Sequence, residues 1–343
     1  MSFLRRLAIC AAIIVSIHHT TAAQTMSVAR KWNETQLACI RLSRARPTIH
    51  ALHLKRMGIA MYDAWAAYDE IARPYMLGQT HGNFTCPFQG VPAVSPEEIE
   101  AYRHQAISYA AYTYLKDHYP PQAGSPASLT AINSLLDATM IELGYDIDFW
   151  SIDYSSGNPA ALGVYIAHQL DEWGFVDGSN EQDDYENQIY DTENMEMNPN
   201  FSGNPGAIYP NQWQSIDLAV CTDQAGNNIP CNGNETIQAI SHDWGWVHPF
   251  SLDSCQLSYH ERGGIDWPIY LDPGEPPYLE STEYLPSEML GPNVNMFKYG
   301  FLTTLMWHWF HNNPDAGMID TSPNNIGNLN YVLNPTLPGE QCP

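Results

Sequence analysis

Two pairs of histidines are spaced so that each pair would share one face of a helix. His50 and His53 stand three residues apart, as do His308 and His311, and side chains at this spacing are neighbours on a helix surface. Such a pair can hold zinc, but a zinc site needs at least a third protein ligand, and no third ligand stands at a suitable spacing from either pair. We therefore interpret these histidines as core or surface side chains and expect no metal ligand among them.

Asp63 is the other side chain whose setting could indicate chemistry. It is the only charged residue between Met57 and Tyr68. Burial of an isolated carboxylate is costly, so Asp63 is expected to be protonated or to have a partner. Arg44 and Arg46 are the expected partners, and we predict a structural role for the pair.

The helix that carries Asp63 is predicted to be the buried centre of the fold, because apolar or small residues occupy all of its faces. Pro47 follows Arg46 as a proline of the first helical turn does, and the helix is expected to end before Pro74. Gly58 lies inside this helix and costs about 1 kcal/mol relative to alanine there. A packing requirement at Gly58 is the expected reason.

Three further helices have clear start signals, since a proline follows Ser95, Ser125 and Asn158. Together with two helices before Tyr68 they make at least five, which favours a mainly α fold. We expect a helical bundle around a buried central helix, and a loop-rich second half that carries a small β-hairpin. The predicted limits of the three helices are Ser95 to Pro120, Ser125 to Gly144, and Asn158 to Gly174.

The first 23 residues are typical of a secretory signal peptide. Two arginines precede a short apolar run, and small residues end at Ala23. The apolar run is too short to span a bilayer. We expect a secreted or periplasmic protein that begins at Gln24 after cleavage near Ala23. The intact mass of exported protein, before and after reduction, should show that start and disulfide bonds. A chain beginning at Met1, or one with six free thiols, would contradict the prediction.

After the signal peptide, residues 24–178 are predicted to form the bundle and residues 179–343 the loop-rich region. The loop-rich region contains an expected hairpin at 216–238 and a terminal helix, MFKYGFLTTLMWHWFHN, apolar enough to be core. We expect both regions to pack as one domain. The acidic segment 179–200 is predicted to be a solvated loop. Calcium is a candidate ligand there, although the calcium-loop spacing of ligands is absent.

The chain is strongly acidic, with 38 Asp and Glu against 14 Lys and Arg and a formal net charge of −24. Such a surface repels nucleic acid and anionic membranes, so neither is expected as a partner. Hydrophobic residues make up 44% of the chain, which suffices for a substantial core.

Six cysteines follow the signal peptide, and an even number in an exported chain favours disulfides. Cys221 and Cys231 flank a turn-like segment and are predicted to pair, which would stabilise the fold by roughly 3 kcal/mol. The other four allow three pairings, and the sequence does not choose among them. These four are Cys39, Cys86, Cys255 and Cys342.

Two adjacent runs, RPTIHALHL at 46–54 and AMYDAWAAYD at 60–69, resemble the N-terminal helical region of bacterial vanadium-dependent haloperoxidase-like proteins. That family is related to the type 2 phosphatidic acid phosphatases. Later runs, among them HDWGWVHPFSL at 242–252 and MIDTSPNNIGN at 318–328, resemble it as well. The resemblance implies a peroxidase that holds vanadate like a phosphate. Lysine, arginines and backbone amides bind the oxyanion, one histidine bonds vanadium, and another serves as the acid–base group.

The vanadate motifs of that family are missing from this chain. The family pattern begins with lysine seven residues before an Arg-Pro pair, but Cys39 and Ala66 stand at those positions before Arg46 and Arg73. The run Pro-Ser-Gly-His does not occur. The nearest match to the last part of the pattern is Ser43-Arg44 followed by His50, with Leu54 in place of the required aspartate. We interpret this match as chance.

The function expected from these observations is that of an exported scaffold half of a haloperoxidase-like protein, truncated before the vanadate-binding motifs and inactive alone. No catalytic or cofactor-binding residue is expected in this chain, and vanadate belongs to the complete family architecture. The expected partner is a separate catalytic half or a second copy of the chain. The alternative is a stand-alone secreted binding or structural protein that has lost the chemistry. An adjacent reading frame with the missing motifs would favour the first.

Overall fold

The computed structural model describes residues 26–209, 212–231, 239–252, 254–271 and 296–313. The described residues form two compact units. The first comprises those up to 188 together with 219–231, and the second comprises those of 189–218 and those after 231. The predicted signal peptide, Cys342 and the run at 318–328 lie outside the described residues.

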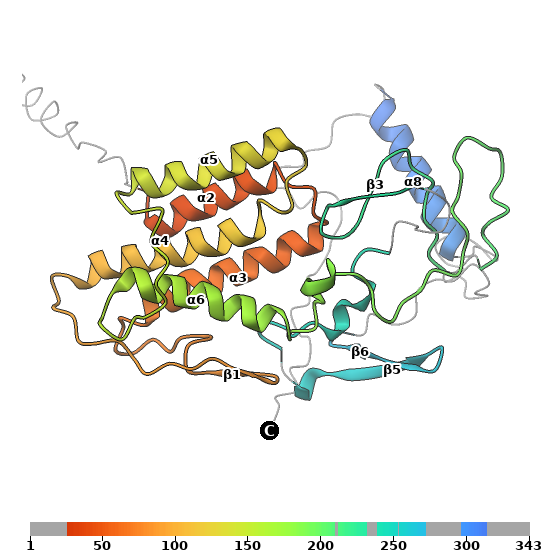
Figure 1. The fold of residues 1–343 in the computed structure, drawn as a ribbon. Coiled ribbons are helices and arrows are strands. Elements are labelled where there is room, and N and C mark those ends of the chain that lie inside the picture. Colours follow the sequence, from red (N-terminus) through yellow and green to blue (C-terminus); the bar gives the residue numbers. More distant parts are fainter. Residues whose placement is uncertain (1–25, 210–211, 232–238, 253, 272–295, 314–343) are drawn as a thin grey trace, which may run out of the picture. The chain divides into compact units, whose positions relative to one another are not determined.

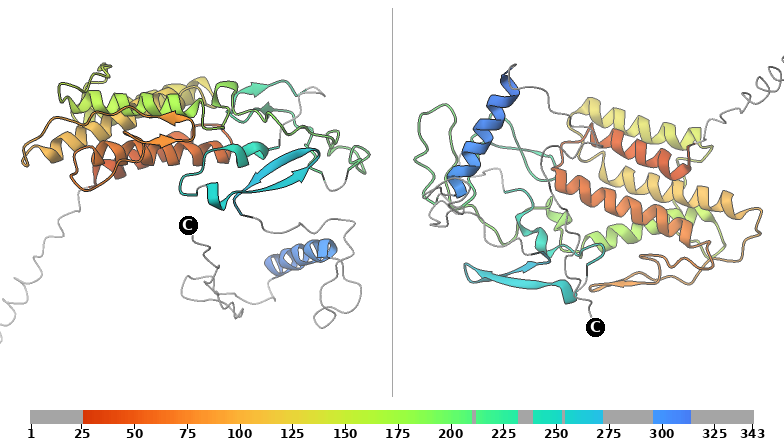
Figure 2. Two further views of the ribbon diagram at one scale, coloured as in Figure 1. Left: turned by 90° about the horizontal axis from the view of Figure 1, so that it is seen from below. Right: turned by 180° about the vertical axis from the view of Figure 1, so that it is seen from behind.

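The first unit is built from helices, and this confirms the prediction of a mainly α fold. Short antiparallel strand pairs join them, β1 (Thr80–His81) with β2 (Phe84–Thr85) and β3 (Cys221–Thr222) with β4 (Asn228–Ile229). None of the helices in the described ranges is long and apolar enough to cross a membrane. The bundle helices lie side by side in Figures 1 and 2: α2 (Val28–Ile40), α3 (Pro47–Ala66), α4 (Ile99–His118), α5 (Pro126–Glu142) and α6 (Pro159–Gly174).

Proline and capping signals place most of these helices correctly. α3 begins at Pro47, as predicted, and ends at Ala66. At the start of α5 the Ser125 hydroxyl accepts a hydrogen bond from the Ser128 amide at 3.1 Å. The Asn158 side chain accepts one from the Ala160 amide at 2.9 Å at the start of α6. α4 begins later than predicted, at Ile99, because the residues after Ser95 form a separate turn first.

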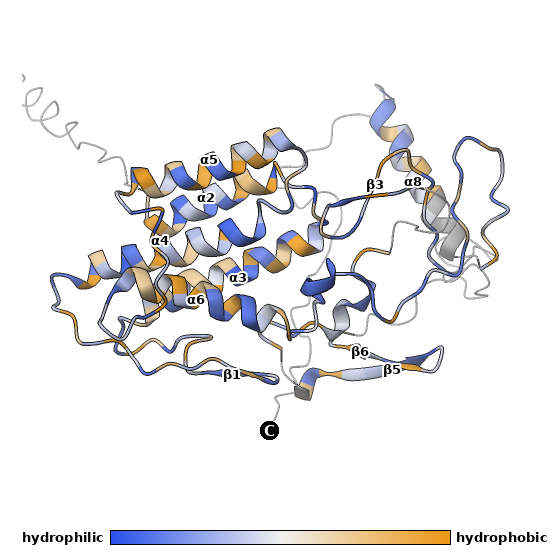
Figure 3. Ribbon diagram, in the orientation of Figure 1, coloured by the Kyte–Doolittle hydropathy of each residue, from blue (hydrophilic) through white to orange (hydrophobic). Residues whose placement is uncertain are grey.

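The central position in the bundle belongs to α4, which packs against α2, α3, α5 and α6. The prediction that α3 is buried on all of its faces is wrong, since Gly58 and Tyr62 are exposed. Apolar residues are spread over all of the bundle helices (Figure 3), so hydropathy alone does not single out the central one. On α4, Ala106, Ala110 and Ala111 are fully buried and let neighbouring helices approach.

The glycine that packing requires is Gly163 on α6, and the prediction for Gly58 is wrong. A methyl group on Gly163 would lie 2.4 Å from the Ala106 carbonyl oxygen and 2.7 Å from the Ala110 nitrogen, both on α4. A methyl group on Gly58 would meet nothing within 4 Å. Gly58 occupies the exposed side of α3, where the close approach of another helix does not occur.

This difference predicts opposite effects for the same substitution. Gly163→Ala should destabilise the protein by about 1 to 3 kcal/mol, because the backbone of α4 must shift. Gly58→Ala should stabilise it by up to about 1 kcal/mol through helix propensity alone. Urea denaturation of both variants measures the two changes in the free energy of unfolding. An equal loss of stability in both would contradict the assigned helix contact.

The second unit contains a β-hairpin and a helix. β5 (Ser258–Arg262) pairs antiparallel with β6 (Ile265–Ile269), and the two-residue turn between them is Gly263-Gly264, both at positive φ, as such turns require. The helix is α8 (Met296–Asn312). Its Leu305 and Trp309 are 64% and 56% exposed, so the prediction that this helix is core is wrong for these side chains. Burial needs a covering neighbour as well as apolar residues, and no described element of the second unit covers them.

Candidate functional site

Charged side chains gather inside the first unit in a group that we call the ionic cluster. Its members come from α3, α4, α6 and the segment that follows α6. Arg56 is fully buried, Asp177 is 3% exposed and His118 is 8% exposed. Buried charges are costly unless they are paired, so their pairing decides what this site can do. The ionic cluster consists of Arg56, His118, Asp171, Asp177 and Glu181.

Arg56 is held by two carboxylates. One terminal nitrogen donates to Asp177 Oδ2 at 2.8 Å, and the other forms a short ion pair with Glu181. Burial by itself lowers the pKa of the guanidinium, but Tyr114, Glu181 and Asp177 raise it, and the pKa lies well above its ordinary value. Arg56 is therefore a charged side chain whose charge is already balanced.

His118 faces only hydrogen-bond acceptors. Its Nδ1 lies 2.7 Å from the Tyr114 carbonyl oxygen, and its Nε2 lies 2.9 Å from Glu181 Oε1 and 3.6 Å from Asp171 Oδ1. Both ring nitrogens must then carry a proton, which makes the ring an imidazolium. Burial alone lowers the pKa of His118, but the hydrogen bond and charge of Glu181 and the charge of Asp171 raise it above 6.5.

Glu181 links the two cations of the ionic cluster. Burial by itself raises the pKa of its carboxyl group, but the hydrogen bond from His118 and the charge of Arg56 hold that pKa well below its ordinary range. Burial also raises the pKa of Asp171 to about 6, against the opposing charge of His118. The ionic cluster thus combines the ionised Arg56, His118 and Glu181 with the carboxyl group of Asp171, whose pKa is about 6.

His53 lies beside the ionic cluster and is neutral. Its Nε2 accepts from the Gln122 side-chain amide at 2.9 Å, so Nδ1 carries the proton and lies 2.7 Å from the Tyr114 hydroxyl oxygen. The pKa of His53 lies well below 6.5, first because of burial and then because of the positive charges of His118 and Arg56. The interpretation of His53 as a core side chain is confirmed, since it is fully buried.

The segment 177–185, which we call the strap, supplies the carboxylates for Arg56. Ser179 is 3% exposed and Tyr185 is 4% exposed, so the prediction of a solvated loop is wrong for this part of 179–200. Ser179 and Glu181 lie inside because Arg56 and His118 bind them, whereas Gln182, Asp183 and Asp184 are exposed. The described residues contain no group of three or more His, Cys, Asp or Glu placed to hold a metal ion, and calcium binding stays a prediction.

Asp63 has backbone partners in place of the expected arginines. Its Oδ1 accepts from the Tyr75 amide at 2.6 Å, and its Oδ2 accepts from the amides of Met76 and Leu77 at 2.7 and 2.8 Å. Burial raises the pKa of Asp63, while these hydrogen bonds oppose the rise. The prediction of an arginine partner is wrong because three amide donors occupy the carboxylate. The structural role predicted for Asp63 agrees with this arrangement.

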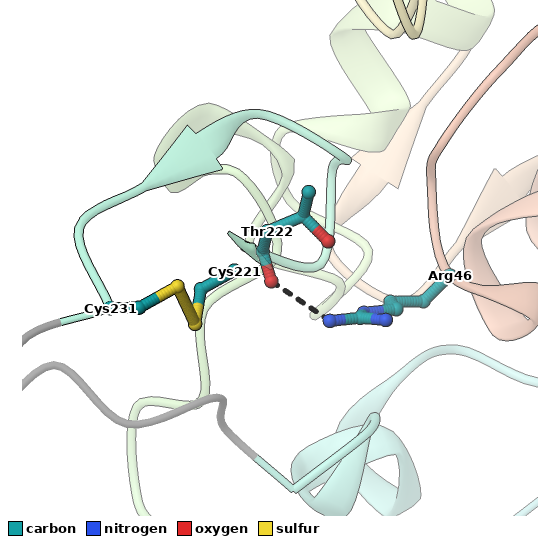
Figure 4. Close-up of a disulfide and its surroundings, with 4 residues drawn as sticks. All are labelled: Arg46, Cys221, Thr222 and Cys231. Carbon is teal, nitrogen blue, oxygen red and sulfur yellow. Dashed lines mark hydrogen bonds between the residues drawn. A yellow bond between two sulfur atoms is a disulfide. The ribbon is translucent and has the colours of Figure 1, made fainter. Parts of the chain in front are cut away.

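The two arginines expected beside Asp63 hold the disulfide hairpin. Arg44 donates to Asn228 Oδ1 at 2.9 Å. Arg46 donates to the Thr222 carbonyl oxygen at 2.9 Å, beside the disulfide (Figure 4). The predicted pairing of Cys221 with Cys231 is confirmed. The tip lies directly against the chain before α3, since a methyl group on Gly226 would be 2.6 Å from the Arg44 carbonyl carbon.

The remaining described cysteines differ in state. Cys39 and Cys86 are buried free thiols, so the expectation that they take part in disulfides is wrong. Burial, the largest cause, raises their pKa values to about 12 and about 11, and the thiols stay protonated and unreactive. Each lies in the hydrophobic core, where it packs as a small apolar side chain. Cys255 is disulfide-bonded.

The match at Ser43, Arg44 and His50 does not form a joint site. Ser43 donates to the Gln122 side chain at 3.4 Å, and Arg44 binds Asn228. The His50 ring stacks on Tyr119 with 6.3 Å between ring centroids and 8° between planes. Each of the three side chains is engaged with a different partner. Of the other pair, His308 and His311 are exposed on α8.

The sequence did not predict the ionic cluster. The only local signal was Arg56 on the same helix face as the apolar residues of α3. Its carboxylate partners stand 121 and 125 residues further along the chain, so no helical spacing joins them to Arg56.

Comparison with known proteins gives little beyond this geometry. No family model matches the chain, and no curated protein sequence matches it. Among solved structures, the chain is similar to the apo form of a bacterial vanadium-dependent chloroperoxidase, with 20% sequence identity and a TM-score of 0.31. The similar part covers 44% of this chain and 27% of the chloroperoxidase chain.

Proposed function

We propose that this chain is the helical scaffold part of a vanadium-haloperoxidase-like protein and performs no vanadate chemistry by itself. Support comes first from the sequence, since the runs at 46–54 and 60–69 that resemble the family make up most of α3. The observation that carries the proposal is the pairing of Arg56. This fully buried cation is bound to two carboxylates, Asp177 and Glu181.

An oxyanion site needs several fixed cationic donors that are not already neutralised. In the ionic cluster the positive charges of Arg56 and His118 face the carboxyl groups of Asp171, Asp177 and Glu181. Vanadate would add negative charge to a group that is already balanced, and the chain's formal net charge of −24 opposes an anion further. The ionic cluster instead joins α3, α4, α6 and the strap, which is a scaffold role.

A direct test is calorimetry with vanadate and a bromination assay with hydrogen peroxide on the vanadate-loaded chain. Neither binding nor turnover above a vanadate-only blank is expected. His50→Ala and His104→Ala serve as a matched pair, since His104 is a histidine on α4 whose side chain is 45% exposed and paired with Glu100. Turnover that disappears in His50→Ala and persists in His104→Ala would overturn the proposal and assign a catalytic role to the match at Ser43-Arg44.

The proposed partner of the scaffold is a separate catalytic half that carries the missing motifs, and a second copy of this chain is the alternative. We further propose export after cleavage near Ala23. The solution mass of the purified chain distinguishes a monomer awaiting another protein from a homo-oligomer.

A further inference from the structure

The strap is held by its side chains although its backbone is unfavourable. Asn180, Asp184 and Tyr185 have φ values of 57°, 54° and 62°, in the left-handed region that residues other than glycine rarely adopt. Four of its side chains compensate by binding the bundle. Asp177, Ser179 and Glu181 contact Arg56, Glu181 also contacts His118, and the Tyr185 hydroxyl lies 3.4 Å from His53 Nε2.

Among these contacts, the one between His118 and Glu181 depends on a proton. Neutral His118 would keep one proton, and either choice disrupts a contact. A proton on Nδ1 leaves the Nε2 lone pair facing Glu181 and Asp171, and a proton on Nε2 leaves the Nδ1 lone pair facing the Tyr114 carbonyl oxygen.

We propose that the strap is a pH-controlled latch, which protonated His118 closes by holding Glu181 and which opens when His118 loses its proton at alkaline pH. Opening releases segment 177–185 from the bundle and uncovers His53 and Arg56. The geometry points to this because both nitrogens of His118 face acceptors. The left-handed backbone of the strap would relax once its side chains no longer contact the bundle.

The charged groups around His118 all affect the free energy of opening the strap. Arg56 stays charged and retains Asp177, so it opposes opening and limits its extent. His53 is neutral and contributes no charge. Asp171 adds a second anion beside His118 once the pH exceeds its pKa of about 6. The titratable and charged groups that interact with His118 directly are His53 from α3, Tyr114 and Asp117 from α4, Asp171 from α6 and Glu181 from the strap. Arg56, His168 and Tyr185 act on these partners of His118.

The sign of the pH effect follows from the shifted pKa values of His118 and Glu181. The pKa of His118 is raised above 6.5, so its contribution is complete below 6.5 and is lost as the pH rises through the raised value. The pKa of Glu181 is lowered from 4.5, so its contribution is present above 4.5 and is lost only in strong acid. The latch is therefore closed at mildly acidic pH and opens toward alkaline pH.

Lys55 titrates in the same range and must be separated from His118. Burial, the largest cause, lowers the pKa of Lys55 to about 8, and the charge of Asp177 opposes this. Loss of the Lys55 charge is a competing explanation for a loosening of the strap at alkaline pH. A Lys55→Gln variant tests whether Lys55 causes the pH dependence of strap protection.

Hydrogen–deuterium exchange of the whole chain, followed on peptides that cover 177–188 and corrected for intrinsic rates, measures opening. Protection in the wild type should fall by up to about tenfold for each pH unit above the pKa of His118. In His118→Gln the protection should be low and independent of pH. His104→Gln, a half-exposed control on the same helix, and Lys55→Gln should keep the pH step.

Protection that stays flat over the pH range in which the His118 ring loses its proton would overturn the latch, as would a pH step that survives in His118→Gln or disappears in Lys55→Gln. If His118→Gln does not fold, ring-nitrogen NMR of the wild type decides. The expected result is a doubly protonated His118 ring at mildly acidic pH whose titration coincides with the loss of strap protection. A neutral ring under those conditions would refute the proposal.

Discussion

Replacing Arg56 by methionine is expected to lower the free energy of unfolding by about 3 to 5 kcal/mol, the largest effect of any single change considered. Methionine fills part of the space but removes the cation that Asp177 and Glu181 share. Glu181 would then keep His118 as its cationic partner, while buried Asp177 would lose its direct ion pair and keep only the weaker influence of Lys55. Chemical denaturation followed by circular dichroism measures the loss.

Arg103→Met is the matched control, because Arg103 also pairs with one carboxylate, Asp69, at 2.8 Å. The Arg103 and Asp69 side chains are 15% and 25% exposed, and the guanidinium lies 4.4 Å from the centre of the Trp65 ring. Solvent partly screens this pair, so its removal should cost clearly less stability than removal of Arg56. Equal losses for Arg56→Met and Arg103→Met would contradict the assignment of Arg56 as a buried, shared cation.

The same reasoning predicts a partial rescue. Removing the carboxylate charges as well, with Asp177→Asn and Glu181→Gln in the Arg56→Met background, should recover much of the lost stability, since the buried anions are then gone. If the triple variant is less stable than Arg56→Met, the loss comes from packing and hydrogen bonds, and the electrostatic account is wrong.

Replacing Asp63 by asparagine is expected to cost roughly 2 to 4 kcal/mol, because buried amides lose their acceptor. Asparagine has one oxygen and one NH2 group where aspartate has two acceptor oxygens. Whichever way the amide points, its NH2 group faces an amide donor of Tyr75 or those of Met76 and Leu77. The turn after α3 should then separate from the helix, and amide exchange at 75–77 should rise together with the loss of stability.

Asp69→Asn is the control for this second prediction. Asp69 also accepts from backbone amides, those of Ile71 and Ala72, but in an exposed turn where water can replace the lost acceptor. A clearly smaller loss than for Asp63→Asn is expected. If both variants lose the same stability, burial of the Asp63 hydrogen bonds is not the cause.

The sequence by itself determined the helices and the disulfide hairpin, because the signals for both are local. The prolines at Pro47, Pro126 and Pro159 begin three helices at the predicted residues. Cys221 and Cys231 pair across a turn, and ten positions separate them in the sequence. In each case the residues that decide the structure stand within a few positions of one another, so propensity, capping and loop closure suffice.

Only the tertiary structure decided which polar residues form the candidate site. Asp63 and Arg56 both interrupt the apolar surface of α3, yet backbone amides from 75–77 satisfy Asp63, while carboxylates beyond α6 satisfy Arg56. Gly58 and Gly163 are likewise indistinguishable by residue type, and only the position of α4 makes Gly163 indispensable. The physical reason is that these requirements are met at long range. A buried charge must have a partner, but many residues in the sequence could supply it, and a glycine does not show whether another helix approaches it. The packing of distant segments decides both.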